Sequence, residues 1–244
     1  NLVKQGVADV VKDFEKDKPN CQILLTKVDD PSQFGVAELG PAGEVERLVE
    51  KPSDPQSDLA LVGVYLFDQT VTEAVNSIRP SARGELEITD AIPYLVTSGR
   101  DVRPSLVTGW WKDTGKKEDL LHANELVLSD LQPDLRGDVV GGEIRGTVRV
   151  GANSQLVDCQ ITGPVVIGDD VHLTRTVVGP HTAIGDGCRL VDANVEESIV
   201  LDSAEIHGWR IRESLIGRAA VLRGSAPSGF VELTLGERSE ILGE

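Results

Sequence analysis

Four short segments in the first half of the chain hold the small and charged residues that phosphate chemistry uses. They are Phe34-Gly35-Val36, Val49-Glu50-Lys51-Pro52, the run 83–90 and the run 110–115. Lys51 stands at the end of a predicted strand that Pro52 stops, and an ammonium group there can hold a phosphate as a point charge. The carboxylate of Glu50 can accept hydrogen bonds from sugar hydroxyls. The second segment therefore predicts a subsite for a sugar phosphate.

Arg83 and Asp113 add two further charges. Arg83 lies in a loop beside a glycine, where its guanidinium could hold the same phosphate with two donors. Asp113 follows a predicted strand and precedes a Thr-Gly turn, a common position for a carboxylate that binds Mg²⁺ in phosphate chemistry. Each segment also has a plain structural interpretation: a surface tripeptide around Lys51, a salt bridge in the loop of Arg83, or a turn and helix N-cap at Asp113. The order and spacing of all four segments favour the functional interpretation.

The elements that position these segments are predicted to mix helices and strands. Apolar residues at helical spacing between Val3 and Phe14 predict an opening helix. Strands are predicted at 23–28, 34–39, 45–50 and 59–67, and Gly40-Pro41-Ala42-Gly43 closes a hairpin between the second and the third. Further helices are predicted at 70–78, 89–97 and 117–128. The first half is therefore expected to be α/β.

The second half repeats aliphatic residues at intervals of 17 positions. Three series share this interval: Val150, Ile167 and Ile184; Leu156, Leu173 and Leu190; Ile144, Ile161, Val178 and Val195. Within one repeat the aliphatic residues are five or six positions apart, which matches neither a strand nor a helix. The spacing matches a coil with three short sides and one inward residue on each side. It predicts a parallel β-helix of hexapeptide repeats that loosens after Leu201 and breaks near Pro227-Ser228-Gly229-Phe230.

The break between the two patterns falls within Ser129–Gly137, so domains are predicted at 1–133 and 134–244.

Composition excludes several classes of protein. The chain has 40 acidic and 24 basic residues and a net charge of −16, which argues against a general nucleic-acid binder. No apolar run approaches the roughly 20 residues that span a membrane. The three cysteines are far apart and in no metal-ligand spacing, which favours a reducing, cytoplasmic location.

Five motifs occur in a characteristic order. They are Phe-Gly-Val-Ala-Glu at 34–38, Val-Glu-Lys-Pro at 49–52, Leu-Val-Gly-Val-Tyr-Leu-Phe-Asp at 61–68, Arg-Gly-Glu-Leu-Glu-Ile-Thr-Asp at 83–90 and Trp-Lys-Asp-Thr-Gly at 111–115. With them the chain resembles the sugar nucleotidylyltransferase family, and most of all the long forms of its glucose-1-phosphate thymidylyltransferases. The resemblance implies the sugar-phosphate part of a Rossmann-like nucleotidyltransferase domain, followed by a left-handed parallel β-helix.

The same resemblance implies which residues bind the sugar. Gly35 and Leu61 would contact it through their backbones, Glu50 would bind its hydroxyls, and Tyr65 would line the pocket.

The resemblance also implies the reaction. Lys51 and Arg83 would hold the 1-phosphate of the sugar, and Asp113 would be one of two aspartates that bind Mg²⁺. The phosphate of glucose 1-phosphate would attack the α-phosphorus of dTTP in line, which forms dTDP-glucose and releases pyrophosphate. These residues do not identify the base of the nucleotide or the sugar, so other nucleotide sugars remain alternative products.

The chain departs from the family pattern at its start. Members begin with a Gly-Gly-x-Gly-Thr-Arg-Leu loop that binds the nucleotide phosphates, and a Gly-Asp-Asn segment supplies the second aspartate. Neither occurs in the 244 residues, and Asn1 matches the asparagine of that segment. We therefore expect a part of a longer protein, without the nucleotide-binding half and inactive by itself.

Two rival functions remain open. A hexapeptide acyltransferase would use a histidine at a coil edge as its base, and His172, His181 and His207 lie in or near the predicted coils. The coils carry no long insertion that could build an acyl-donor site. A non-catalytic assembly or regulatory module would use the open ends and flat faces of the solenoid for subunit contacts. We expect a homo-oligomer on the same grounds.

Overall fold

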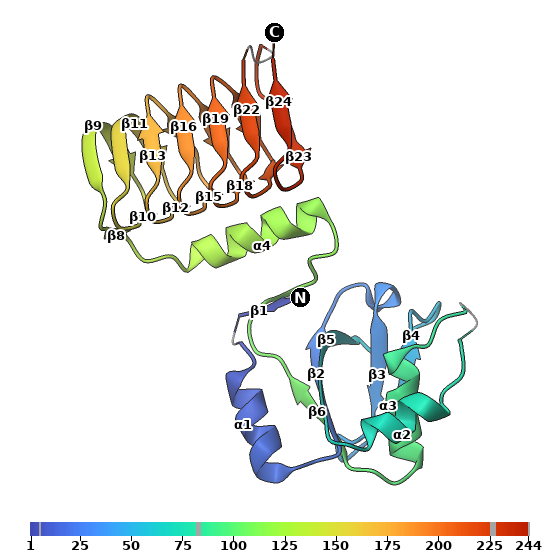
Figure 1. Ribbon diagram of the computed structural model, residues 1–244. Helices are drawn as coiled ribbons and strands as arrows, with labels where there is room; N and C mark the ends of the chain where they lie inside the picture. Colours follow the sequence, from blue (N-terminus) through green and yellow to red (C-terminus); the bar gives the residue numbers. More distant parts are fainter. Residues whose placement is uncertain (5, 82–83, 225–227, 244) are drawn as a thin grey trace. The chain divides into compact units, whose positions relative to one another are not determined.

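The chain divides into two compact units, Asn1–Asp113 and Thr114–Glu244, which are described separately (Figure 1). The computed structural model describes residues 1–4, 6–81, 84–224 and 228–243. The predicted boundary between 133 and 134 marks the start of the coils, because the first coil strand begins at Asp134. The second unit also includes the helix that precedes this strand. None of the helices in these ranges is long and apolar enough to cross a membrane.

The first unit contains a five-stranded sheet with helices on both faces (Figure 1). Its elements are β1 (Leu2–Val3), α1 (Ala8–Asp17), β2 (Cys21–Lys27), the 3-10 turn Pro31–Gln33, β3 (Gly35–Leu39), β4 (Val45–Glu50), β5 (Leu59–Phe67), α2 (Val71–Ser77), α3 (Ile88–Thr97), β6 (Val102–Leu106) and β7 (Trp111–Lys112). The sheet order is β4-β3-β5-β2-β6, and its pairs are antiparallel except for β2 with β6. β1 and β7 form a separate antiparallel pair.

β2 is buried on both faces, which explains its continuous apolar sequence. Ile23 and Leu25 pack in a cluster that includes residues of α2 and α3. The residue between them, Leu24, points to the opposite face and packs with Val10 of α1. The sheet is therefore covered by α1 on one side and by α2 and α3 on the other.

The predicted elements are confirmed except at the start of the chain. β3 and β4 form the predicted hairpin around 40–43, and β5 spans the predicted 59–67. The opening helix begins at Ala8, because Val3 pairs with Trp111 in the β1–β7 ladder. The helical spacing of the first valines cannot reveal this pairing with a segment more than one hundred residues away.

The second unit is a parallel β-helix with α4 (Lys117–Ser129) lying along it (Figure 1). One side consists of β8 (Asp134–Leu135), β10 (Val148–Val150), β12 (Val165–Ile167), β15 (Thr182–Ile184), β18 (Ile199–Val200), β21 (Leu215–Ile216) and β23 (Thr234–Leu235). The other sides share β9 (Asp138–Arg145) and β11 (Gln155–Thr162), and continue through β13 (His172–Thr174), β14 (Val177–Val178), β16 (Arg189–Val191), β17 (Asn194–Glu196), β19 (Glu205–His207), β20 (Arg210–Arg212), β22 (Val221–Arg223) and β24 (Glu240–Leu242).

The predicted inward positions are confirmed. The nine residues from Val150 to Val195 in the three series are between 0% and 2% exposed, and Ile144 is partly buried against the same core. The predicted loosening after Leu201 is a shortening of the coil by one residue, since Ile184 pairs with Val200, sixteen residues later. The ladder continues past the predicted break to β23 and β24. Pro227 of that break lies outside the described residues.

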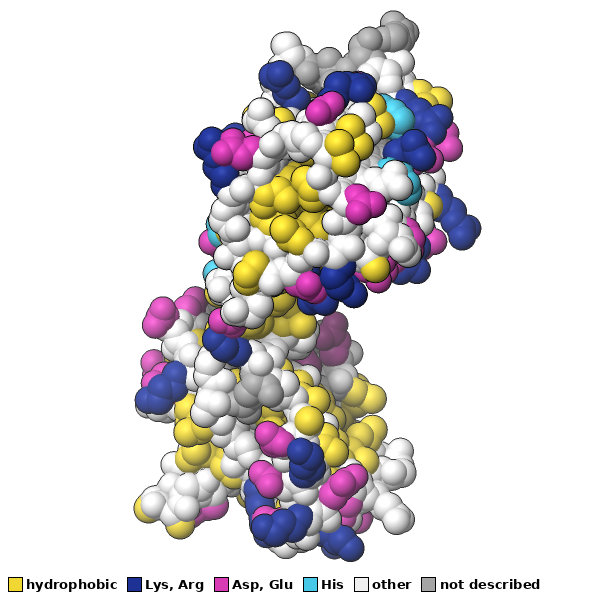
Figure 2. Space-filling model, turned by 90° about the vertical axis from the view of Figure 1, so that its left-hand side faces the viewer, with side chains coloured by type: hydrophobic (Ala, Val, Ile, Leu, Met, Phe, Trp, Pro, Cys, Tyr) yellow, Lys and Arg dark blue, Asp and Glu magenta, His cyan; other side chains and the backbone are white. Residues whose placement is uncertain are grey.

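The first coil, formed by β8 and β9, has inward positions that no other described coil covers at this end of the solenoid (Figure 2). Leu135 pairs with Val150 and Val139 pairs with Leu156, yet Leu135 and Val139 are 55% and 40% exposed. Figure 2 looks onto this end of the solenoid and shows hydrophobic side chains gathered near its centre. The solenoid therefore begins with an open end.

Two adjacent valines of β14 test the inward register. Val178 is 0% exposed and Val177 is 37% exposed, so aspartate at the two positions should have different effects. Val178→Asp would bury a carboxylate without a partner and should lower the free energy of unfolding by about 3–5 kcal/mol or more. Val177→Asp should lower it by less than about 1 kcal/mol. Urea unfolding followed by circular dichroism measures both values, and equal values would contradict the register.

Candidate functional site

Three side chains converge on the α-carbon of Gly35 at the start of β3. A Cβ atom on Gly35 would lie 2.8 Å from Cδ1 of Leu61, 3.0 Å from Oε2 of Glu50 and 3.0 Å from Cγ2 of Thr89. Strand pairing supplies two of these neighbours, because Gly35 is opposite Glu50 in the β3–β4 ladder and Leu61 lies on β5, the other neighbour of β3. A Cβ atom at position 35 would collide with these neighbours, so the close approach of the three side chains to the buried backbone requires glycine.

Lys51 follows β4 directly and has an unusual backbone conformation. Its φ is 43°, in the left-handed region that favours glycine. Its N–H donates a 2.9 Å hydrogen bond to the carbonyl of Phe34, which continues the β3–β4 pairing beyond Glu50. The side chain is exposed, and none of the described carboxylates forms an ion pair with it. The conformation therefore leaves a solvent-accessible ammonium group directly after the Gly35–Glu50 pair.

Tyr65 and Thr89 add two hydroxyl groups to this region. Burial, and then the charge of Glu50, raise the pKa of Tyr65 to about 12, so the phenol is protonated at neutral pH and can donate a hydrogen bond. Thr89 lies in the first turn of α3 and is 3% exposed, and its Oγ1 has no hydrogen-bond partner in the described part of the chain. Leaving a buried hydroxyl unpaired costs free energy, so Thr89 is a candidate for a hydrogen bond to a ligand.

Thr89 is absent from the residues that the sequence singled out. It lies within the motif at 83–90, but its methyl group meets Gly35 only because α3 packs against β3 and β4. A three-dimensional neighbour of this kind has no signal in residue type or spacing. Arg83, which was predicted to hold the phosphate, lies outside the described residues.

Asp113 is exposed at the end of β7. Two contacts of Trp111 fix this strand: its Nε1 donates a 3.1 Å hydrogen bond to the carbonyl of Val62, and its ring meets Phe34 edge-on at 5.2 Å between centroids. These contacts connect the end of β7 with the residue before Gly35. The helix-cap interpretation of Asp113 is wrong, because the N-cap residue of α4 is Lys116.

Asp113 fits only part of a metal site. Mg²⁺ usually keeps several waters and is bound through one or two carboxylates together with substrate phosphates. One exposed carboxylate is compatible with that arrangement. Within the described ranges, no group of three or more His, Cys, Asp or Glu side chains could hold a metal by itself.

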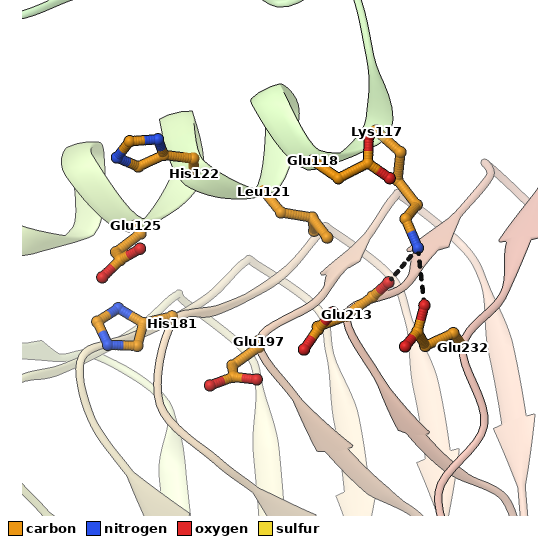
Figure 3. Close-up of a pocket in the computed structure, with 9 residues that line it drawn as sticks. All are labelled: Lys117, Glu118, Leu121, His122, Glu125, His181, Glu197, Glu213 and Glu232. Atoms are coloured by element: carbon orange, nitrogen blue, oxygen red, sulfur yellow. Dashed lines mark hydrogen bonds and ion pairs between the residues drawn. The ribbon is translucent and has the colours of Figure 1, made fainter.

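A cavity lies in the second unit, between α4 and the coils (Figure 3). Its volume is about 360 Å³, and its lining residues are Lys117, Glu118, Leu121, His122, Glu125, His181, Glu197, Glu213 and Glu232. The Nζ of Lys117 donates to the carbonyl of Glu213 at 3.0 Å and to Oε2 of Glu232 at 3.3 Å, as the dashed lines in Figure 3 show. Five carboxylates against one lysine, itself already engaged, would repel a phosphate. The two hydrogen bonds of Lys117 therefore hold α4 against the coils, and the cavity beside them does not suit an anionic substrate.

The three coil histidines occupy separate positions. His172 begins β13, His207 ends β19, and His181 precedes β15 and accepts a 2.8 Å hydrogen bond from Nδ2 of Asn124 through its carbonyl. His207 Nε2 is 3.8 Å from the carboxylate of Glu205. Among the described residues, no hydrogen bond or ion pair joins two of these histidines.

Named relatives match nearly the whole chain. A glucose-1-phosphate thymidylyltransferase from Streptomyces griseus is 46% identical over 220 residues, which are 89% of this chain and 62% of that protein. Another from Streptomyces antibioticus is 43% identical over 246 residues, which are 99% of this chain and 69% of that protein. A low-salt glycan biosynthesis nucleotidyltransferase from Haloferax volcanii is 40% identical over 250 residues, with coverages of 99% and 69%.

These relatives and a family model agree on the first unit. The chain spans 62% of the length of the Streptomyces griseus protein, so the matched region is a part of that relative. The family model described as nucleotidyl transferase matches residues 1–130, which include Gly35, Glu50, Lys51 and Asp113. The chain therefore belongs to the nucleotidyl transferase family.

Proposed function

We propose that this chain binds the sugar phosphate in a reaction that joins glucose 1-phosphate to dTTP and forms dTDP-glucose and pyrophosphate. One observation carries the proposal: Glu50, Leu61 and Thr89 converge on Gly35, and Lys51 follows Glu50 directly. The names of the two Streptomyces relatives support glucose and thymidine as sugar and base.

The sugar would lie against the backbone of Gly35. Glu50 would accept hydrogen bonds from its hydroxyls, while the protonated phenol of Tyr65 and the unpaired hydroxyl of Thr89 would donate to it or accept from it. Leu61 would contact the sugar through its backbone. Several positioned donors and acceptors fix the orientation of a sugar, and orientation decides where its phosphate lies.

Lys51 would hold the 1-phosphate and reduce its charge. In the reaction, an oxygen of the sugar phosphate forms a bond to the α-phosphorus of dTTP, and the bond from that phosphorus to the β-phosphate oxygen breaks as pyrophosphate leaves. Both reactants are anions, so neutralisation and alignment are the main tasks of the protein. Asp113 would hold a Mg²⁺ ion, which neutralises phosphate charge when bound.

Lys51→Ala should weaken the binding of glucose 1-phosphate to this chain by roughly ten- to hundredfold, because one charged hydrogen bond to the phosphate is lost. Calorimetric titration measures the effect. Lys12→Ala is the matched control, since Lys12 is an exposed lysine on α1. Equal binding by the Lys51→Ala protein and the parent, or no binding by the parent, would contradict the assignment.

Asp113→Asn should act on the metal dependence in the whole protein. The amide keeps the shape of the side chain but removes a negative charge, so kcat should fall about tenfold or more and higher Mg²⁺ should restore part of it. Rates of dTDP-glucose formation across a Mg²⁺ titration test this. A curve identical to that of the parent would remove Asp113 from the site.

The chain alone should not release pyrophosphate from dTTP and glucose 1-phosphate in the usual range of about 1–1000 per second. The reason is that neither the Gly-Gly-x-Gly-Thr-Arg-Leu loop nor the Gly-Asp-Asn segment of the family occurs in these 244 residues. A coupled pyrophosphate assay measures it, and turnover in that range would show that the present residues suffice.

A further inference from the structure

The first coil of the solenoid combines an exposed apolar surface with an unpaired strand edge. Leu135, Val139 and Val140 are 55%, 40% and 61% exposed. The residues stacked on the first two, Val150 and Leu156, are 0% and 1% exposed. β9 pairs with β11 along one edge, and no described strand pairs with its other edge. Such an edge is a template for another strand.

The sequence of β9 is complementary to itself in the antiparallel direction. β9 reads Asp-Val-Val-Gly-Gly-Glu-Ile-Arg from Asp138 to Arg145, and its centre lies between Gly141 and Gly142. Both glycines have positive φ, 71° and 77°, where β9 turns from one side of the coil to the next. A two-fold axis through this corner would place each half of β9 opposite the other half of a second copy.

This arrangement pairs opposite charges at one position and apolar residues at the next, while Val140 would face Glu143 of the second copy, the residue whose carboxylate Arg145 contacts at 2.7 Å within one chain. Asp138 would face Arg145 of the second copy, and Val139 would face Ile144 of the second copy. Residues directly opposite in an antiparallel pair point to the same face. Val139 and Ile144 are both inward positions, because they stack on buried residues of β11. The apolar pair would therefore cover the open core, and the ion pair would lie outside it.

The same two-fold axis would also relate β8, on the third side of the first coil, to β8 of the second copy. The axis through the corner of β9 also crosses the middle of β8, so Leu135 would meet Leu135 of the second copy. Asp134 would then face Arg136 of the second copy. Within one chain these two side chains already approach to 3.3 Å, so both lie near this end of the solenoid.

We propose that two copies of the chain associate end to end through the first coils of their solenoids, with β8 and β9 of each copy forming the interface. A two-fold contact of this kind uses the same surface on both copies. A slip of two residues would place Asp138 opposite Glu143 of the second copy, so like charges disfavour that register. The end of a single coil is a small surface, and we expect a dimer in reversible equilibrium with the monomer. This inference does not rest on the proposed function.

Charge reversal tests the interface and its register in the 244-residue chain. Sedimentation equilibrium should show a monomer–dimer equilibrium. Asp138→Arg or Arg145→Asp should raise the dissociation constant by about tenfold or more, because each creates two pairs of like charges across the axis. The double variant, Asp138→Arg with Arg145→Asp, should recover most of the affinity, since opposite charges face each other again. Leu135→Glu should also weaken the dimer, because it places a carboxylate in the covered core.

Controls separate association from folding. All three positions are exposed in the single chain, and circular dichroism melts verify that each variant is folded. Arg189→Asp makes the same charge change on β16, at an exposed position away from the end, and should leave the dissociation constant unchanged. A chain that stays monomeric at every concentration would overturn the proposal. So would single reversals that associate like the parent, or a double variant no better than the single ones.

Discussion

The solenoid depends on one constraint: a three-sided coil cannot bury its own inward residues, so each coil needs another coil above it. Aliphatic residues such as Ile167 and Ile184 therefore stack directly on one another. Successive coils must also approach each other closely at their corners. A Cβ on Gly168 would lie 2.2 Å from Oδ1 of Asp186, and the same oxygen accepts a 2.8 Å hydrogen bond from the N–H of Asp169. Each corner carboxylate thus satisfies the backbone of the preceding coil. The first coil obeys the constraint on one face only, and its exposed leucine and valine follow directly.

The first unit depends on a comparable close approach at Gly35. There the sheet brings Glu50 and Leu61 from the two neighbouring strands, and α3 brings Thr89 from above. The packing that buries Ile92 and Leu95 of α3 also determines how closely Thr89 approaches Gly35. The packing of the core in the first unit therefore also positions the residues of the candidate site. Rigid strands and a helix hold the polar groups, which is the arrangement that positions a substrate reproducibly.

The sequence predicts what depends on local periodicity and misses what depends on distant contacts. The interval of 17 residues predicts the inward series because every coil repeats the same local environment. The hairpin and β5 are predictable because turn residues and a long apolar run bound them. The pairing of Val3 with Trp111 and the place of Thr89 arise from contacts between remote segments, which no spacing reports. The shorter coil after Ile184 appears in the sequence only as a loosening of the 17-residue interval, because the inward residues keep their aliphatic type.

The acidic composition and an anionic substrate are compatible because electrostatic forces in salt solution are short-ranged. At physiological ionic strength the screening length is about 8 Å, so distant carboxylates contribute little at the candidate site. A cation in contact with a phosphate, at about 4 Å, gains roughly 1–4 kcal/mol depending on the local dielectric constant. The exposed ammonium of Lys51 can therefore outweigh a net charge of −16 that is spread over the whole surface. The glutamate-lined cavity under α4 is the opposite case, because its carboxylates lie within contact range of anything that enters. Local geometry, and not the total charge, decides which of the two can accept a phosphate.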